Sequence, residues 1–136
     1  MGRGWLCKMA FTLLSLLSAT MPTTACEVII PLVSGRTRVP WPSTKVPDWE
    51  CAVAYLFGGI SPVAVGVTGK WRNPAAPTGR GLVPDPQNRY EVAVADERVG
   101  ELREFLRFTC APFEQECLYF KVGTTVEFLD NPLGWP

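Results

Sequence analysis

The sequence predicts an α+β fold, with about five mostly antiparallel strands covered by one main helix and stapled by disulfides. Three observations lead to this prediction. The chain has 136 residues, a length that suits one domain. The hydrophobic periodicity of its C-terminal half reads strand, helix, strand, strand. Four cysteines follow an N-terminal segment typical of exported proteins, and an even number of cysteines in such a chain indicates disulfides.

The composition excludes two classes of protein. Basic and acidic residues both number 13, and the hydrophobic class makes up 47% of the chain. A fully disordered chain needs low hydrophobicity and high net charge, whereas a general electrostatic nucleic-acid binder needs a clear basic excess. Histidine is absent, which removes the commonest general base and the commonest metal ligand. We therefore expect no metal, no cofactor and no nucleic-acid partner.

Residues 1–25 are interpreted as a signal peptide, which leaves residues 26–136 as one small domain. Arg3 and Lys8 precede a short apolar run that is too short to span a bilayer, so no transmembrane helix is expected in the mature chain. Small residues before Cys26 favour cleavage after Ala25. The expected location is secreted or periplasmic. Two alternatives stay open: a lipoprotein anchored through Cys26, and a buried N-terminal helix of the domain itself.

The cysteine positions favour two disulfides. With Cys7 removed in the signal peptide, Cys110 and Cys117 flank a short loop that a local bridge closes easily. The remaining pair, Cys26 and Cys51, would then tie the N-terminal segment to the next strand. Other pairings of the four cysteines stay open, because the sequence alone does not choose among them.

The first half of the domain is predicted to contain strands and one loop. Residues 27–33 are β-branched and apolar, and Pro31 within them favours an edge strand. Residues 34–48 are rich in proline and read as a loop. Residues 49–57 and 63–71 alternate apolar with other residues, so each is predicted to be a strand. The shared face of the first of these two strands would carry Trp49, Cys51, Val53, Tyr55 and Phe57.

The second half shows clearer periodicity. Residues 89–95 alternate as a strand, and a helix is predicted over residues 97–109, with Asp96 as its N-cap. Strands follow at residues 117–122 and 125–129, joined by a short turn. The helix would pack on the sheet through one apolar face, made of Val99, Leu102, Phe105 and Leu106. Arg103 would face water.

Residues 72–88 form the best candidate for a binding surface. This stretch holds four prolines and two glycines, and long loops of this kind are often functional. Basic and aromatic residues gather at its start, so Trp71, Arg72 and Arg80 are the predicted binding residues. The expected partner is another protein or an anionic glycan. The alternative is a tolerated insertion whose cations are simply solvated.

Paired carboxylates offer the remaining catalytic possibility. Glu114 and Glu116 lie near the predicted cysteine bridge, while Asp48 and Glu50 flank a tryptophan. Two carboxylates in a sugar-sized cleft are typical of a glycosidase. The alternative is that these acids are solvated loop residues.

Three fragments of the chain are similar to a family of small exported bacterial proteins of unknown function. The fragments are Leu56-Phe57-Gly58, Gly69-Lys70-Trp71-Arg72, and Phe113-Glu114-Gln115-Glu116 before a strand, within residues 54–128. The resemblance implies a ferredoxin-like α+β arrangement or a split variant of it. It implies no assigned activity and carries no functional residue over to this chain.

The sequence thus predicts a small exported, non-catalytic binding or interaction protein without an assigned catalytic residue. Two alternatives stay open. One is an envelope lipoprotein with a structural role, anchored through Cys26, and the other is a small carboxylate-dependent hydrolase.

Overall fold

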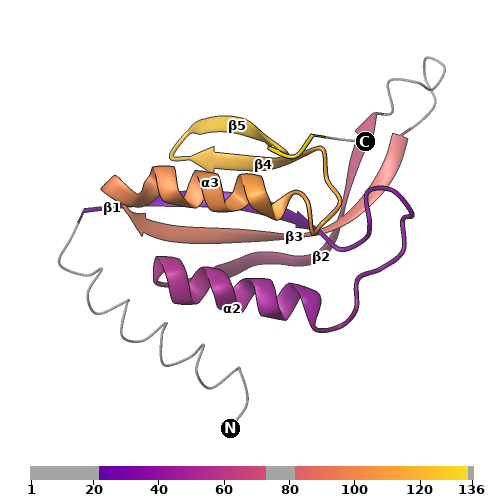
Figure 1. Cartoon of the computed structure of the whole chain (residues 1–136), viewed down its shortest axis with the longest axis horizontal. Helices are drawn as coiled ribbons and strands as arrows, with labels where there is room; N and C mark the ends of the chain where they lie inside the picture. Colours follow the sequence, from indigo (N-terminus) through magenta and orange to yellow (C-terminus); the bar gives the residue numbers. More distant parts are fainter. Residues whose placement is uncertain (1–21, 73–81, 135–136) are drawn as a thin grey trace, which may run out of the picture.

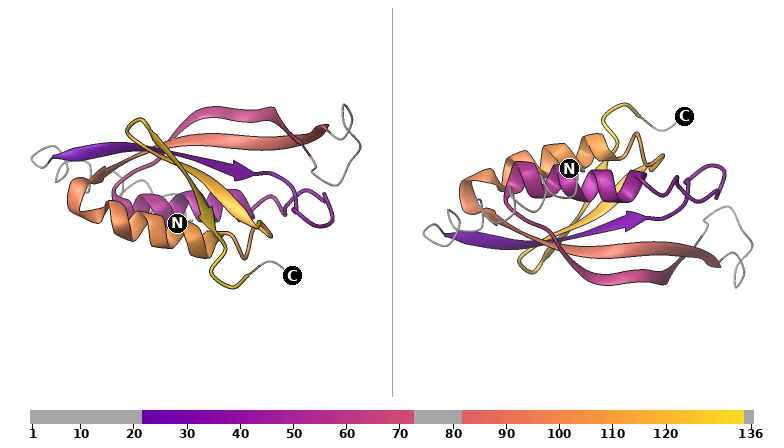
Figure 2. Two further views of the ribbon diagram at one scale, coloured as in Figure 1. Left: turned by 90° about the horizontal axis from the view of Figure 1, so that it is seen from above. Right: turned by 90° about the horizontal axis from the view of Figure 1, so that it is seen from below.

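The computed structural model describes residues 22–72 and 82–134, which form two layers. One layer is a five-stranded sheet with the strand order β2-β3-β1-β4-β5, in which every neighbouring pair is antiparallel. The other layer is made by helices α2 and α3, which cover the same face of the sheet (Figures 1 and 2). The elements are β1 (Thr23–Pro31), α2 (Lys45–Phe57), β2 (Ser61–Arg72), β3 (Leu82–Ala95), the 3-10 turn η1 (Asp96–Arg98), α3 (Val99–Thr109), β4 (Cys117–Val122) and β5 (Thr125–Asp130). The α+β class and the five antiparallel strands are confirmed, although two helices rather than one cover the sheet in the described residues.

Strand β1 lies in the middle of the sheet, so the prediction of an edge strand at residues 27–33 is wrong. It pairs with β3 along its whole length and with β4 over Cys26–Val28. Pro31 is the last residue of β1 and lies past the pairs with β4, where a missing N–H interrupts no shared ladder. The strand begins at Thr23, so the predicted cleavage after Ala25 would fall inside it.

Residues 49–57 form most of helix α2, so the strand predicted there is wrong. Trp49, Val53 and Phe57 fit both a two-residue and a four-residue spacing, and all three are buried. Tyr55 decides between the two, because a strand would bury it with them, yet it is 68% exposed. Gly58 ends the helix with a φ of 99°, and its N–H donates to the carbonyl of Ala54.

Strands β2 and β3 form a long antiparallel pair. The strand predicted at residues 63–71 is confirmed within β2, and the one at residues 89–95 is the second half of β3. The loop predicted over residues 72–88 is wrong in part, because β3 already begins at Leu82. Residues 73–81 lie outside the described part of the chain.

The C-terminal predictions are confirmed with two corrections. Helix α3 and strands β4 and β5 lie where the periodicity placed them. Asp96 is the first residue of the turn η1 and not the N-cap of α3, which is Arg98. The carboxylate of Asp96 accepts a hydrogen bond from the hydroxyl of Thr24 at 2.7 Å. Arg103 does not simply face water, because its guanidinium donates two hydrogen bonds of 3.0 Å to Glu127 of β5.

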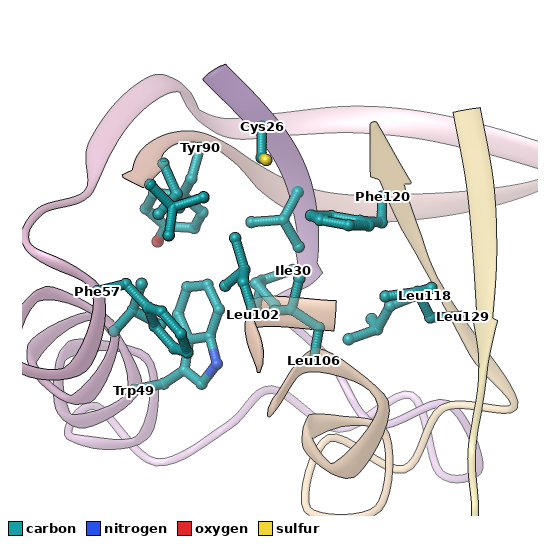
Figure 3. Packing of buried hydrophobic residues seen from close by; sticks show 14 of the residues in the cluster. Cys26, Ile30, Trp49, Phe57, Tyr90, Leu102, Leu106, Leu118, Phe120 and Leu129 are labelled. Carbon is teal, nitrogen blue, oxygen red and sulfur yellow. The ribbon is translucent and has the colours of Figure 1, made fainter. Parts of the chain in front are cut away.

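The core fills the space between the sheet and the helices (Figure 3). Along β1, β4 and the second half of β3, every second residue points into it, as the pleat requires. From the sheet, Ile30, Tyr90 and Phe120 are fully buried, and Leu102 and Leu106 of α3 pack on them. The residues between these inward ones therefore face the opposite side, which α2 and α3 leave uncovered.

The predicted disulfides are wrong, since no bridge joins any two of Cys26, Cys51, Cys110 and Cys117. Cys26 is 1% exposed and points into the core, where burial raises its thiol pKa to about 11. Cys110 is buried with its sulfur 3.4 Å from the carbonyl oxygen of Leu129. Cys117 begins β4 on the opposite face of the sheet.

No helix in residues 22–72 and 82–134 combines the length and the apolar character that crossing a membrane requires.

Candidate functional site

The uncovered face of the sheet is hollowed into a cavity of about 340 Å³, which we call the open-face cavity. A volume of this size suits a small organic ligand. Every strand contributes to its lining, together with the segment before β4. The lining residues are Ile29, Pro31, Gly69, Lys70, Asp85, Gln87, Arg89, Gln115, Cys117, Leu118, Tyr119 and Phe128.

The floor of the open-face cavity is the outward side of the central strand. Ile29 and Pro31 lie two residues apart on β1, so their side chains share this face. In the register with β3, Ile29 is opposite Arg89 and Pro31 is opposite Gln87. β4 flanks β1 on the other side. The two walls of the cavity therefore come from β3 and from β4 with β5, across an apolar floor.

The β3 wall is polar and charged. Asp85, Gln87 and Arg89 alternate along the strand and so point to one face. Gln87 is only 7% exposed, and its side-chain amide lies directly over Gly69 of β2. A Cβ at Gly69 would stand 2.9 Å from Oε1 of Gln87, so a side chain at this position would displace the Gln87 amide. The absence of a Cβ at Gly69 thus makes room for the buried amide.

The opposite wall is aromatic. Tyr119 of β4 and Phe128 of β5 are direct cross-strand partners, and their rings meet edge to face with centroids 6.1 Å apart. Phe128 is 67% exposed, which is unusual for so large an apolar side chain. Cys117 lies on the same wall, two residues before Tyr119, and burial is the main cause that raises its thiol pKa. It is therefore a neutral thiol at physiological pH.

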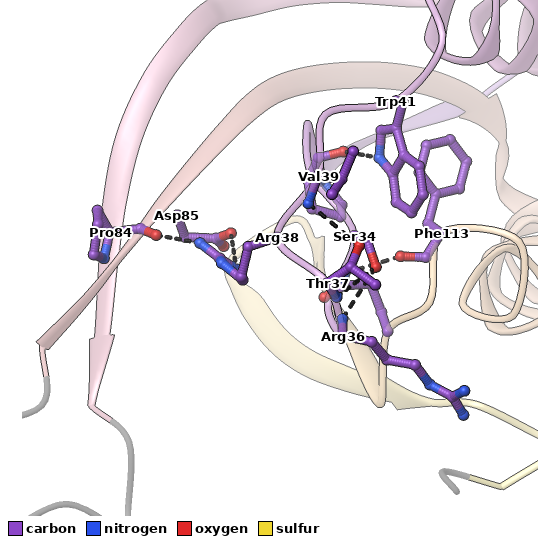
Figure 4. Close-up of polar contacts among 11 residues, drawn as sticks. Ser34, Arg36, Thr37, Arg38, Val39, Trp41, Pro84, Asp85 and Phe113 are labelled. Atoms are coloured by element: carbon purple, nitrogen blue, oxygen red, sulfur yellow. Dashed lines mark hydrogen bonds and ion pairs between the residues drawn. The ribbon is translucent and has the colours of Figure 1, made fainter.

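A loop between β1 and α2 reaches the charged wall (Figure 4). The hydroxyl of Ser34 donates to the carboxylate of Glu114 and accepts hydrogen bonds from the backbone N–H groups of Arg36 and Thr37, each 3.1 Å long. Arg38 then extends from this loop to β3, where it donates to the carbonyl of Pro84 and pairs with Asp85. Both Arg38 and Glu114 have positive φ, a conformation that costs free energy in a residue with a side chain.

The charged side chains on the β3 wall form ion pairs that are longer than a hydrogen bond. The guanidinium of Arg38 stands 3.7 Å from the carboxylate of Asp85, and that of Arg89 stands 3.8 Å from Glu27. Burial raises the pKa of Asp85, and the positive charge of Arg38 opposes this rise. The lining thus holds both signs of charge, with Lys70 as a further cation.

The predicted binding residues lie beside this cavity or outside the described residues. Trp71 and Arg72 end β2, directly after the cavity residues Gly69 and Lys70. Arg80 falls within residues 73–81, outside the described part of the chain. Their role stays a prediction.

The predicted carboxylate pairs do not line the cavity. Glu114 accepts the hydroxyl of Ser34 in the loop contact described above. Glu50 lies on α2, on the other face of the sheet, and hydrogen-bonds with Tyr90. Burial raises the pKa of Glu50 and raises that of Tyr90 to about 12. Among the described residues, no group of three acidic or cysteine side chains is placed to hold a metal ion.

The raised pKa of Glu50 predicts a pH effect on stability. The folded protein holds this proton more tightly than the unfolded chain, so stability falls as pH rises through and above the ordinary carboxyl pKa of 4.5. Glu50→Gln keeps a neutral group there at every pH. We expect urea unfolding to show the variant gaining stability relative to the wild type between acidic and neutral pH. A difference that stays constant over this range would contradict the prediction.

The sequence analysis did not identify the residues that form the two walls of the open-face cavity. Asp85 and Gln87 were placed in a loop, and Tyr119 and Phe128 were treated only as strand residues. A usable signal was present, because alternation around the apolar Phe120 and Leu129 sends both aromatic residues to the opposite face. A tyrosine and a phenylalanine on a face without helices are candidates for a ligand wall.

Comparisons with known proteins identify the fold. No protein-family model and no curated protein matches the chain. Among solved structures, the chain is similar to a phage SAM lyase in complex with S-methyl-5'-thioadenosine. The TM-score is 0.61 at 14% identity, and the match covers 81% of this chain and 91% of the lyase chain. A phage SAM lyase in the apo state gives a TM-score of 0.51 at 16% identity, covering 79% and 88% of the two chains.

These matches establish a shared fold and correct the functional expectation. Both neighbours are enzymes, which contradicts the expected non-catalytic binding protein and favours the enzyme alternative. The description of the chain as a disulfide-bonded protein is likewise contradicted, because the described cysteines are not bridged. The location of the protein and its resemblance to small exported bacterial proteins stay predictions.

Proposed function

We propose that this protein is a lyase that binds S-adenosylmethionine in the open-face cavity and cleaves it to S-methyl-5'-thioadenosine. One observation carries the proposal. A chain whose fold matches 91% of a phage SAM lyase has a cavity of about 340 Å³ on its uncovered sheet face, with an aromatic wall opposite a polar one.

The two walls suit the two halves of such a ligand. Tyr119 and Phe128 offer ring surfaces on which a purine can stack. The β3 wall offers the carboxylate of Asp85 and the amide of Gln87 to hydroxyl and amino groups. An apolar floor between polar and aromatic walls is typical of small-molecule sites.

The proposed reaction depends more on how the protein positions the reactant than on proton transfer by its side chains. The product keeps the methyl group, the sulfur and the adenosyl group, so the bond that breaks joins the sulfur to the amino-acid chain. Its electron pair goes to the sulfur, which changes from a sulfonium cation to a neutral thioether. The carbon that leaves the sulfur gains a bond to an oxygen of the ligand's own carboxylate, so the amino-acid part departs as a lactone with no net transfer of a proton. The thioether leaving group needs no protonation, which is compatible with a chain that has no histidine. The residues of the cavity would act by holding the reactant in a reactive conformation.

Two measurements test the proposal. Incubation with S-adenosylmethionine should yield S-methyl-5'-thioadenosine, detected by chromatography with mass analysis. S-methyl-5'-thioadenosine itself should protect Cys117 from alkylation at mildly alkaline pH, because that thiol lies on the cavity wall. Labelling of Cys51, which lies on α2 across the sheet, provides the internal reference and should not change. Absence of both product and protection would refute the proposal.

A further inference from the structure

The β3 wall of the open-face cavity is a row of three groups with opposite charges at its ends. Asp85, Gln87 and Arg89 point to the same face at every second position. From Asp85 to Arg89 the strand advances about 13 Å at roughly 3.3 Å per residue. Side chains that lean toward the middle of this row can therefore enclose a small dipolar group from both ends.

Both end charges retain capacity for a ligand. The partner of Asp85 is Arg38 at 3.7 Å, and the partner of Arg89 is Glu27 at 3.8 Å. These distances exceed the roughly 2.7–2.9 Å of a charge-assisted hydrogen bond. Arg38 also donates to the carbonyl of Pro84, so its guanidinium is shared. Arg38 and Glu27 therefore neutralise the charges of Asp85 and Arg89 and still leave both groups able to hydrogen-bond with a ligand.

The middle of the row is fixed in place. Gln87 is buried, and its amide occupies the space that the missing Cβ of Gly69 leaves. A fixed amide between an acid and a base presents one donor group and one acceptor atom. This arrangement matches a group that itself carries an ammonium and a carboxylate on one carbon.

The geometry points to the Asp85–Gln87–Arg89 row as the recognition site for the zwitterionic α-amino-acid end of the ligand. The ammonium group lies toward Asp85 and the carboxylate toward Arg89, while the base lies against Tyr119 and Phe128. This inference rests on the proposed function and adds an orientation to it. S-methyl-5'-thioadenosine lacks the amino-acid end, so the product loses the ionic contacts with Asp85 and Arg89 and is released more readily than the reactant.

The test compares two ligands that differ in this end. S-adenosylhomocysteine carries the amino-acid group and a neutral sulfur, whereas S-methyl-5'-thioadenosine carries no amino-acid group. Calorimetric titration of the full chain should show that Asp85→Asn and Arg89→Gln each weaken S-adenosylhomocysteine binding by about tenfold or more. Both should leave S-methyl-5'-thioadenosine binding within about twofold of the wild type. Glu91→Gln, the next outward position on β3, which is not among the lining residues of the cavity, serves as the matched control and should change neither.

The outcomes separate the inference from the proposed function. If the two variants weaken both ligands equally, the orientation is wrong and the proposed function stands. Tighter binding of adenosine monophosphate than of S-adenosylhomocysteine to the wild type would also overturn the inference, because it would assign the cations to a phosphate. If the wild type binds neither S-methyl-5'-thioadenosine nor S-adenosylhomocysteine, both proposals fail. Thermal melting of each variant confirms that the compared proteins are folded.

Discussion

Phe120→Ala is expected to lower the free energy of unfolding by about 3–5 kcal/mol, whereas Phe128→Ala should lower it by less than about 1 kcal/mol. Both phenylalanines lie on the β4–β5 hairpin and lose the same atoms. Phe120 is fully buried between the sheet and α3, so its removal leaves a cavity that the packed core cannot close. Phe128 is 67% exposed on the opposite face. Denaturant unfolding of the two variants measures the difference.

This pair of variants tests the assignment of the two sheet faces. Phe120→Leu provides a milder change in case Phe120→Ala does not fold, and it should fall between the wild type and the alanine variant. Equal destabilisation by Phe120→Ala and Phe128→Ala would mean that the uncovered face is packed as tightly as the core. The open-face cavity would then not exist in solution.

Phe128→Ala is expected to weaken the binding of S-methyl-5'-thioadenosine by about 5-fold to 150-fold. The stacking of a base on an aromatic side chain contributes about 1–3 kcal/mol, which corresponds to that range of affinity. Tyr119→Ala should have a similar effect, because the two rings form one wall. Tyr119→Phe keeps the ring and should retain most of the affinity. Calorimetric titration gives each value directly.

A matched control lies on the other side of the molecule. Phe108 on α3 is 55% exposed, so Phe108→Ala removes an exposed ring that is remote from the open-face cavity. This variant should bind the ligand as the wild type does. If Phe108→Ala and Phe128→Ala weaken binding equally, or if neither does, the aromatic wall is not the base site.

The sequence predicted an element correctly where its apolar residues fit either the helical or the strand periodicity, but not both. Helix α3 was found because Leu102 and Leu106 repeat at helical spacing with polar residues between them. Helix α2 was missed because Trp49, Val53 and Phe57 satisfy both periods, and only the exposure of Tyr55 separates them. The spacing of residues along the chain does not reveal whether Tyr55 is exposed, because its exposure depends on which surfaces the rest of the folded chain covers.

The position of β1 could not be predicted for a similar reason. Pro31 argues for an edge strand only if it lies within the ladder on both sides. In the structure, the pairs with β4 end at Val28. The extent of each ladder is a property of the folded sheet, and no residue within the strand encodes it.

The candidate site was predictable only at its border. Trp71 and Arg72 follow the cavity residues on β2, but the acid and the amide of the wall lie in a stretch that reads as loop because of its prolines. Pro84 and Pro86 are tolerated in β3, and each still pairs with β2. The cavity itself arises from strands that are distant in the sequence, so its composition becomes visible only once the sheet order is known.

The alternation of inward and outward side chains on β3, β4 and β5 has a consequence for how this protein can diverge. Positions that fix the fold and positions that line the open-face cavity interleave along the same strands, yet their side chains point to opposite faces of the sheet. Substitution effects at such separated positions are close to additive. Ligand specificity can therefore change during evolution while the core between the sheet and the helices is preserved. In a library randomised at the outward positions, a large fraction of the variants should fold. In one randomised at the inward positions, this fraction should be small.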